Sequence, residues 1–194
     1  MARVPNLTED DIPSEFKDLF IKYRDLFSSF GNQIPVYAHA PIGMKHVFGM
    51  SLETKESGVL PLHLIEIAVI AASYANKCSY CVAHHSSILV ELGLDNNKVS
   101  NLNSQNTSNL SEIELLVRDY AIAVTERAWG IRDEMFEQLK KHFNNRQIVE
   151  LTMRIGLTGL FNKVNQALEI EMEDDLMPVF LGKGLSKEIL DKII

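Results

Sequence analysis

Apolar residues recur at spacings of three and four along almost the entire chain of 194 residues, and no alternating run of β-branched residues interrupts them. This period is typical of helix faces and argues against a sheet. From Leu62 to Tyr74 the chain is apolar on nearly all sides, as expected for a buried central helix. The pattern predicts a single all-α domain over residues 1–194, with a helical N-terminal arm (1–60), a core (61–172) and a C-terminal tail (173–194).

Proline, glycine and capping residues predict where the helices begin and end. Asn76 and Lys77 interrupt the apolar pattern and predict a chain reversal, and Ser111 with Glu114 predicts a capping box. The polar stretch 95–111 is expected to be a loop with at most a short helix. The expected helices span residues 14–31, 44–56, 62–74, 79–92, 111–128, 132–143 and 147–170, and the tail from 174 is expected to be a loop with one helical turn near 186–193.

The charge balance excludes several classes of partner. Nineteen basic and 26 acidic residues give a net charge of −7, whereas nucleic acids and anionic membranes both attract a basic face. We therefore expect no nucleic-acid and no membrane partner. Residues 1–10 lack the apolar segment of a signal peptide, and the most apolar stretch is too short to span a bilayer. The expected location is the cytoplasm, where thiols stay reduced.

The candidate chemistry is concentrated between residues 78 and 85, which include both cysteines and two of the six histidines. On a helix Cys78, Cys81 and His85 share one face, and Cys81 lies one turn from His85. Cys78 falls in the first turn, where unpaired backbone N–H groups and the helix dipole favour a thiolate. A thiolate, a base and a second thiol three residues away indicate a redox centre.

Glu66 is the fourth candidate. The midpoint between Glu66 and His85 falls beside the expected reversal at Asn76–Lys77, so an antiparallel helix pair places the two opposite each other. A carboxylate in so apolar a helix needs a partner, because an unpaired buried charge is costly. We expect Glu66 to orient His85 and to pass a proton through it to Cys81.

Other polar residues near this centre are assigned simpler roles. We expect His84 on the surface or in an interface, Tyr80 in packing or at the pocket wall, and His63 exposed or capping its helix, although it could pair with Glu66. Trp129 is expected in a packed corner. Polar residues of the late helix are expected to hydrogen-bond to the central helix pair or to another subunit; they are Asn162, Lys163, Asn165 and Gln166.

Two alternative interpretations of the cysteines remain. The first is a zinc site formed by Cys78, Cys81 and His85 with Glu66 or His84 as fourth ligand, although structural zinc sites usually join two ligand pairs from separate segments. The second is a pair of buried thiols beside a core histidine. Neither accounts as well for the spacing of the thiols and the opposed glutamate.

The set of Glu66, Cys78-Ser79-Tyr80-Cys81 and His85 resembles the signature of the alkylhydroperoxidase AhpD-like family, within the carboxymuconolactone decarboxylase superfamily. The resemblance is strong from about residue 61 to 94 and looser over the N-terminal helices and residues 162–170. It implies an AhpD-like helical bundle that forms homo-oligomers and reduces peroxides with a cysteine pair. We expect neither a metal nor another cofactor.

The resemblance also implies residue roles. It matches Cys81 to the thiol that attacks the peroxide, Cys78 to its disulfide partner, and His85 with Glu66 to the proton relay. The best-known members have a histidine between the cysteines where this chain has Tyr80, which bears on the strength of the activity.

The sequence therefore predicts a thiol-dependent hydroperoxide reductase, regenerated by an external lipoyl- or thioredoxin-type dithiol. Two alternatives stay open: a lyase that decarboxylates a lactone with Glu66 and His85 as acid and base, and a non-enzymatic redox-sensing or zinc-binding module.

Overall fold

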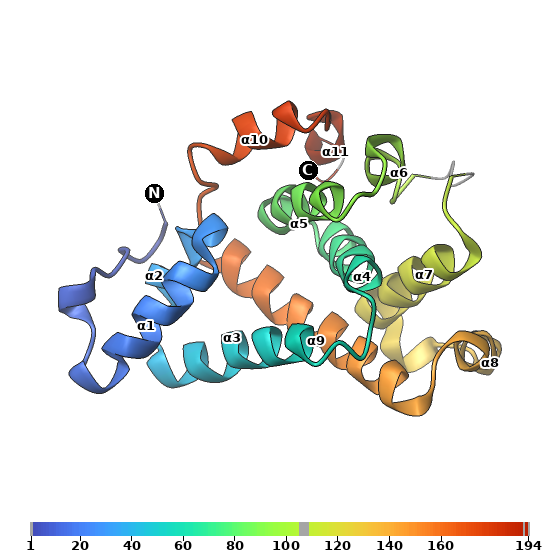
Figure 1. The fold of residues 1–194 in the computed structure, drawn as a ribbon, viewed down its shortest axis with the longest axis horizontal. Helices are drawn as coiled ribbons and strands as arrows, with labels where there is room; N and C mark the ends of the chain where they lie inside the picture. Colours follow the sequence, from blue (N-terminus) through green and yellow to red (C-terminus); the bar gives the residue numbers. More distant parts are fainter. Residues whose placement is uncertain (1, 105–108, 192, 194) are drawn as a thin grey trace.

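The computed structural model describes residues 2–104, 109–191 and 193, and this part of the chain is helical without any strand (Figure 1). The predicted all-α class is confirmed. Three 3-10 turns are η1 (Glu9–Asp11), η2 (Ser28–Phe30) and η3 (Ala128–Gly130). The α-helices are α1 (Ser14–Leu26), α2 (Gln33–Tyr37), α3 (Pro41–Glu56), α4 (Leu62–Ala75), α5 (Ser79–Glu91), α6 (Asn96–Ser100), α7 (Glu112–Arg127), α8 (Asp133–His142), α9 (Asn145–Ala167), α10 (Leu176–Gly182) and α11 (Glu188–Asp191).

Helix α4 is the centre of the molecule. Every residue from Leu64 to Ser73 is buried, because α5, α7 and α9 all pack against this helix. Burying one Leu, Ile or Val side chain stabilises a fold by about 1.5–3 kcal/mol, so the position of α4 is strongly fixed. The only ionisable residue in that buried stretch is Glu66, and its position is fixed with the helix.

The turn between α4 and α5 sets the position of the first cysteine. Lys77 has a left-handed backbone with φ of 59°, and its N–H donates to the carbonyl of Tyr74. The N–H of Cys78 donates to the carbonyl of Ser73 at 2.8 Å. These two bonds form a Schellman motif, which ends α4 and ties the backbone of Cys78 to it. Cys78 is then the N-cap of α5, which runs back along α4 as the sequence predicts.

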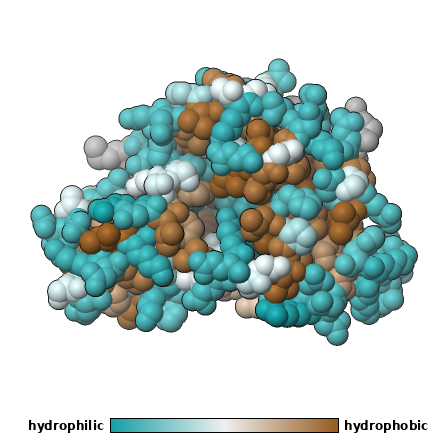
Figure 2. Space-filling model, in the orientation of Figure 1, coloured by the Kyte–Doolittle hydropathy of each residue, from teal (hydrophilic) through white to brown (hydrophobic). Residues whose placement is uncertain are grey.

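The buried apolar side chains form two clusters. The major cluster joins α4 and most of α5 to α7, α8, the first half of α9, α10 and α11. The N-terminal cluster joins α1, α2 and α3 to the start of α5 and the end of α9, and it includes Cys78, Tyr80 and Cys81. Figure 2 shows a hollow in the face of the molecule between the N-terminal helices and the α4–α5 pair. The cysteines therefore lie where the two clusters meet.

Two local predictions differ from the structure. The tail forms α10, because Leu176 and Phe180 are buried against the major cluster, so the expected loop there is wrong. Trp129 is 92% exposed, since Ile131 rather than Trp129 packs at that corner. The stretch 95–111 contains only the short helix α6, capped by Asp95, which agrees with the prediction; its residues 105–108 lie outside the described part. Nowhere in the described part is a helix both long and apolar enough to span a membrane.

Candidate active site

The two cysteines are free thiols that are almost fully covered, with exposed fractions of 1% for Cys78 and 3% for Cys81. A hydrogen bond from the thiol of Cys81, aided by its backbone N–H, lowers the pKa of Cys78 to about 7 despite burial. The same bond to Cys78, together with burial, raises the pKa of Cys81. When the pair loses its first proton, the remaining proton is therefore shared and the negative charge rests on Cys78. This direction agrees with the thiolate expected at the start of the helix.

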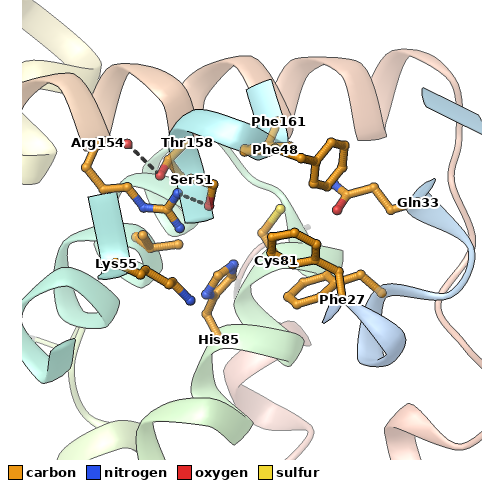
Figure 3. A pocket seen from close by; sticks show the side chains of 12 residues that line it. Phe27, Gln33, Phe48, Ser51, Lys55, Cys81, His85, Arg154, Thr158 and Phe161 are labelled. Carbon is orange, nitrogen blue, oxygen red and sulfur yellow. Dashed lines mark hydrogen bonds between the residues drawn. The ribbon is translucent and has the colours of Figure 1, made fainter. Parts of the chain in front are cut away.

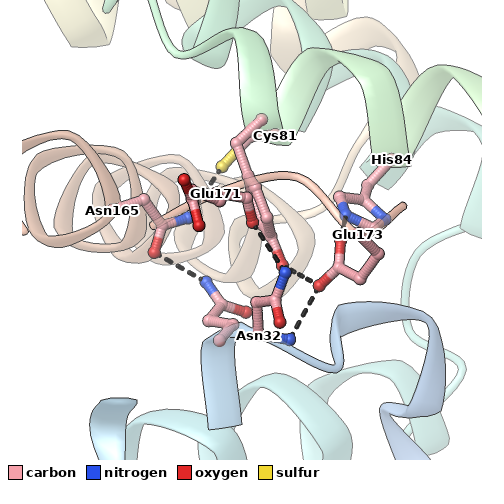
Figure 4. A network of polar contacts seen from close by, with 8 residues as sticks. Asn32, Cys81, His84, Asn165, Glu171 and Glu173 are labelled. Atoms are coloured by element: carbon pink, nitrogen blue, oxygen red, sulfur yellow. Dashed lines mark hydrogen bonds and ion pairs between the residues drawn. The ribbon is translucent and has the colours of Figure 1, made fainter. Parts of the chain in front are cut away.

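Asn165 of α9 donates a hydrogen bond to the second sulfur. Its Nδ2 lies 3.4 Å from Sγ of Cys81 (Figure 4). Its Oδ1 accepts from Nε2 of Gln33 at 2.9 Å and from the hydroxyl of Tyr37 at 3.3 Å. Because two donors occupy the oxygen, the amide nitrogen must face the sulfur. A donor held in this way stabilises negative charge on Cys81 when its proton leaves.

The neighbouring polar residues of α9 brace the turn that carries the cysteines. Nδ2 of Asn162 donates to Oγ of Ser73 at 3.0 Å, and Oδ1 of Asn162 accepts from Nδ2 of Asn76 at 2.9 Å. Nε2 of Gln166 donates to the carbonyl of Asn76 at 2.8 Å. The expected hydrogen bonds from this polar segment to the central helix pair are thus confirmed, whereas Lys163 is exposed.

The structure brings Glu66 and His85 together, as the position of the reversal predicts. Nδ1 of His85 lies 2.5 Å from Oε2 of Glu66, and Nζ of Lys55 lies 3.0 Å from Oε1. Burial alone raises the pKa of Glu66, but His85, Lys55 and Arg154 outweigh it and hold that pKa well below its usual value. Both carboxylate oxygens have partners, so His63, half-buried at the start of α4, is not needed as one.

His85 is set up as a base. Burial lowers the pKa of His85 more than Glu66 raises it, so the imidazole is neutral at neutral pH. Since Glu66 accepts the hydrogen bond at Nδ1, the proton of the neutral ring sits on Nδ1 and Nε2 keeps its lone pair. A neutral imidazole with a free Nε2 is the form that accepts a proton.

Cys81 and His85 line one cavity (Figure 3). The space open to the centre of a water molecule is about 40 Å³, and all the space between the lining atoms, with the open solvent at the mouth, is about 450 Å³. Its wall combines aromatic side chains with a few polar groups, contributed by Phe27, Phe30, Gln33, Phe48, Ser51, Lys55, Val69, Cys81, His85, Arg154, Thr158 and Phe161. Sequence reasoning missed Lys55 and Arg154, since neither stands in a local pattern that marks a site. Of the two sulfurs, Cys81 is the one on this wall.

His84 is buried, with an exposed fraction of 2%, so the expectation of a surface position is wrong. Its ring stacks on Phe30 of η2 at 4.4 Å, and its Nε2 lies 2.7 Å from Oε2 of Glu173. The other oxygen of Glu173 accepts from the hydroxyl of Tyr80 at 2.9 Å and from the backbone N–H of Asn32 at 2.8 Å (Figure 4). The α9–α10 connection thus covers this side of α5, and Glu173 is a further residue that sequence reasoning missed.

His84 and His85 are therefore engaged by two different carboxylates, Glu173 and Glu66. Within the described residues, no group of three or more His, Cys, Asp or Glu side chains is placed to hold a metal ion. The four-ligand set of the zinc alternative is not assembled there, because His85 turns to Glu66 and His84 turns to Glu173.

Comparison with known proteins agrees with the predicted resemblance. The family model named Carboxymuconolactone decarboxylase family matches residues 43–108, a range that contains Glu66, both cysteines and His85. A curated relative, the uncharacterized protein YdfG of Bacillus subtilis (strain 168), is 24% identical over 142 residues, which are 70% of this chain and 93% of the relative.

Solved structures show the same fold. An uncharacterized peroxidase-related protein of Ralstonia eutropha JMP134, described as an alkylhydroperoxidase AhpD core, has a TM-score of 0.78 at 20% identity, covering 90% of this chain and 94% of that one. A protein of unknown function from Agrobacterium tumefaciens, suggested to be the antioxidant-defence protein AhpD, has a TM-score of 0.67 at 25% identity, covering 73% and 97%. A variant of the debrominase Bmp8 in complex with 2,3,4-tribromopyrrole has a TM-score of 0.76 at 20% identity, covering 93% and 96%.

Proposed function

The chain has an AhpD-like fold and a carboxymuconolactone decarboxylase family region, and from this premise we propose that it is a thiol-dependent hydroperoxide reductase. The family and the fold support a peroxidase-related or decarboxylase-type activity. The observation that favours the peroxidase is the placing of a thiol, Cys81, and a neutral base, His85, on one cavity wall, with a second thiol hydrogen-bonded behind the first.

In the first step Cys81 attacks the hydroperoxide. His85 takes the thiol proton at Nε2, a sulfur–oxygen bond forms, the oxygen–oxygen bond breaks, and the leaving oxygen takes the proton and departs as an alcohol. Cys81 becomes a sulfenic acid, and the peroxide is reduced by two electrons. Asn165 stabilises the thiolate that attacks, and Glu66 stabilises the imidazolium that forms in passing.

In the second step Cys78 resolves the sulfenic acid. A thiol with a pKa of about 7 is about half ionised at neutral pH, which suits it to attack another sulfur. Its attack forms the Cys78–Cys81 disulfide and releases water. An external dithiol of the lipoyl or thioredoxin type then reduces the disulfide and becomes a disulfide itself.

The test is a thiol count with matched cysteine variants. One equivalent of cumene hydroperoxide should remove two free thiols per chain in the native protein, and a dithiol should restore both. Cys78→Ser should give a sulfenic acid at Cys81, trapped by dimedone and located by mass spectrometry. Cys81→Ser should not consume the peroxide. Full turnover in Cys81→Ser would contradict the role of Cys81 as the attacking thiol. So would dimedone attached mainly to Cys78 in the native protein.

A second candidate is the removal of bromine from an aromatic ring. The aromatic wall of the cavity favours it, and the debrominase Bmp8 has the same fold. The balance is again two electrons: the two thiols become a disulfide, the carbon–bromine bond becomes a carbon–hydrogen bond, and bromide and a proton leave. Bromide release from 2,3,4-tribromopyrrole by the reduced protein, without consumption of cumene hydroperoxide, would favour this candidate over the first.

Turnover that survives alkylation of both thiols would instead favour the lyase, because that reaction needs only Glu66 and His85.

A further inference from the structure

Arg154 is a buried cation on the wall of the cavity. The residue is 4% exposed, and Nη1 donates to Oγ of Ser51 at 2.7 Å (Figure 3). Its Nε is also buried and has no hydrogen-bond partner among the described residues. A guanidinium carries five N–H groups, and a buried donor without a partner is costly. Arg154 therefore has donors left for a molecule that enters the cavity.

The surrounding charges leave that cation uncompensated. Glu66 is the buried carboxylate on this side of the molecule, and its two oxygens are already occupied by Lys55 and His85. His85 is neutral, since burial lowers its pKa. Cys81, the sulfur on this wall, keeps its proton at rest. Lys55, Glu66 and Arg154 together carry one net positive charge, and the partly ionised Cys78 lies behind the wall rather than on it. A single anion in the cavity would balance the charge of these three groups.

The rest of the cavity wall indicates which kind of group carries the negative charge. Phe27, Phe30, Phe48 and Phe161 present aromatic faces or edges to the cavity, and Val69 adds an aliphatic group. Such walls bind flat apolar groups, while the few polar groups among them fix the orientation.

We propose that the cavity takes a flat, apolar organic acid, and that Arg154 binds its carboxylate. Guanidinium donors in a plane fit the two oxygens of a carboxylate. If the protein is the hydroperoxide reductase proposed above, the substrate class is an aromatic hydroperoxide with one carboxylate, whose peroxide group faces Cys81 and His85. The hydroperoxide part rests on that proposed function, whereas the carboxylate part rests on Arg154 alone.

The test compares two inert ligands of equal shape, 4-isopropylbenzoate and 4-isopropylbenzamide, by isothermal titration calorimetry on the reduced full chain. A charge-assisted pair is worth roughly a tenfold to hundredfold gain in affinity, so the benzoate should bind more tightly by about that factor. Arg154→Gln should remove the preference. Arg146→Gln, on the same helix but exposed and paired with Glu150, should keep it.

If Arg154→Gln does not fold, Arg154→Met replaces it in the same binding comparison. Proteins often tolerate the replacement of a buried charge by an apolar side chain of similar volume. Equal affinity of the native protein for both ligands, binding of neither, or a preference that survives in Arg154→Gln or Arg154→Met would each overturn the proposal. These readouts need no turnover. A preference for the benzoate without peroxide consumption overturns only the hydroperoxide reductase, and peroxide consumption without that preference overturns only the carboxylate site.

Discussion

Glu66 shows how one buried carboxylate determines the state of a site. Alone in the most apolar helix it would favour its protonated form. With Lys55 at one oxygen and His85 at the other it stays ionised, and it holds the ring of His85 in one tautomer. The neutral ring and the ionised carboxylate form a pair whose protonation differs from that of the unfolded chain.

Acid should therefore destabilise the protein in two stages. The folded pKa values of His85 and Glu66 both lie below their ordinary values of 6.5 and 4.5. The unfolded chain then binds more protons, so the free energy of unfolding falls as the pH drops below about 6.5 and falls further below about 4.5. Guanidinium unfolding from pH 8 to 2, followed by circular dichroism, measures both stages.

His85→Gln should flatten the first stage and also reduce the second, because His85 is one of the groups that lower the pKa of Glu66. His63→Gln, half-buried at the start of α4, should change neither stage. The expectation fails if native protein has the same free energy of unfolding at pH 7 and pH 5. Circular dichroism is the appropriate signal because the single tryptophan, Trp129, is 92% exposed in the folded protein.

At the scale of elements, the connection between α9 and α10 fastens α5 to the N-terminal helices. Glu173 reaches His84 and Tyr80 on α5 and the backbone of Asn32 before α2. Burial raises the pKa of Glu173, but His84 and the N–H of Asn32 outweigh it, so the pKa is lowered and the carboxylate stays charged. Hydrogen bonds to a charged group are the stronger kind.

Glu173→Gln keeps the size of this side chain and removes its charge. We expect the free energy of unfolding to drop by about 1–3 kcal/mol, the usual value of such bonds. Cys78 and Cys81 should also react faster with a maleimide in the native protein, because the cover over α5 is loosened. Asp174→Asn, exposed and one residue away, is the control. Unchanged labelling rates in Glu173→Gln would show that this connection does not cover the thiols.

Elements whose signals are local were predictable from the sequence. The capping box of Ser111 and Glu114 begins α7, and the break at Asn76–Lys77 ends α4. Given that turn, the helical period places Glu66 against His85, so two members of the candidate site follow from a segment of twenty residues.

Contacts between distant segments were not predictable in this way. Arg154 meets Ser51 across 103 positions, and Glu173 meets His84 across 89. No spacing rule connects such positions, because their approach depends on how whole helices pack. For the same reason α10 was missed: its apolar residues gain stability only against the major cluster.

For the whole molecule, the surface of α9 suggests how copies assemble. Val149, Met153 and Leu160 lie at helical spacing on one side of α9, with exposed fractions of 56%, 52% and 41%. Exposed apolar residues that share a helix face favour association. The homo-oligomer stays a prediction, and this stripe is its expected contact.

Met153→Glu should then shift the protein to a smaller species, since a charge in the contact would have to be buried. Size-exclusion chromatography with light scattering gives the mass of each variant. Ile42→Glu is the matched control, because Ile42 is 66% exposed on α3, away from the stripe. A native protein that is monomeric, or a Met153→Glu variant of unchanged mass, would contradict the assignment.

The cavity has two sides. One is formed by residues 27–55, and the other is formed by α4, α5 and α9. The reacting groups Cys81 and His85 and the cation Arg154 lie on the second side, whereas Lys55, the partner of Glu66, and the phenylalanines near it lie on the first. Separation of the two sides would therefore take the cavity apart. We therefore expect activity to be lost on separation of the two sides, before any helix unfolds.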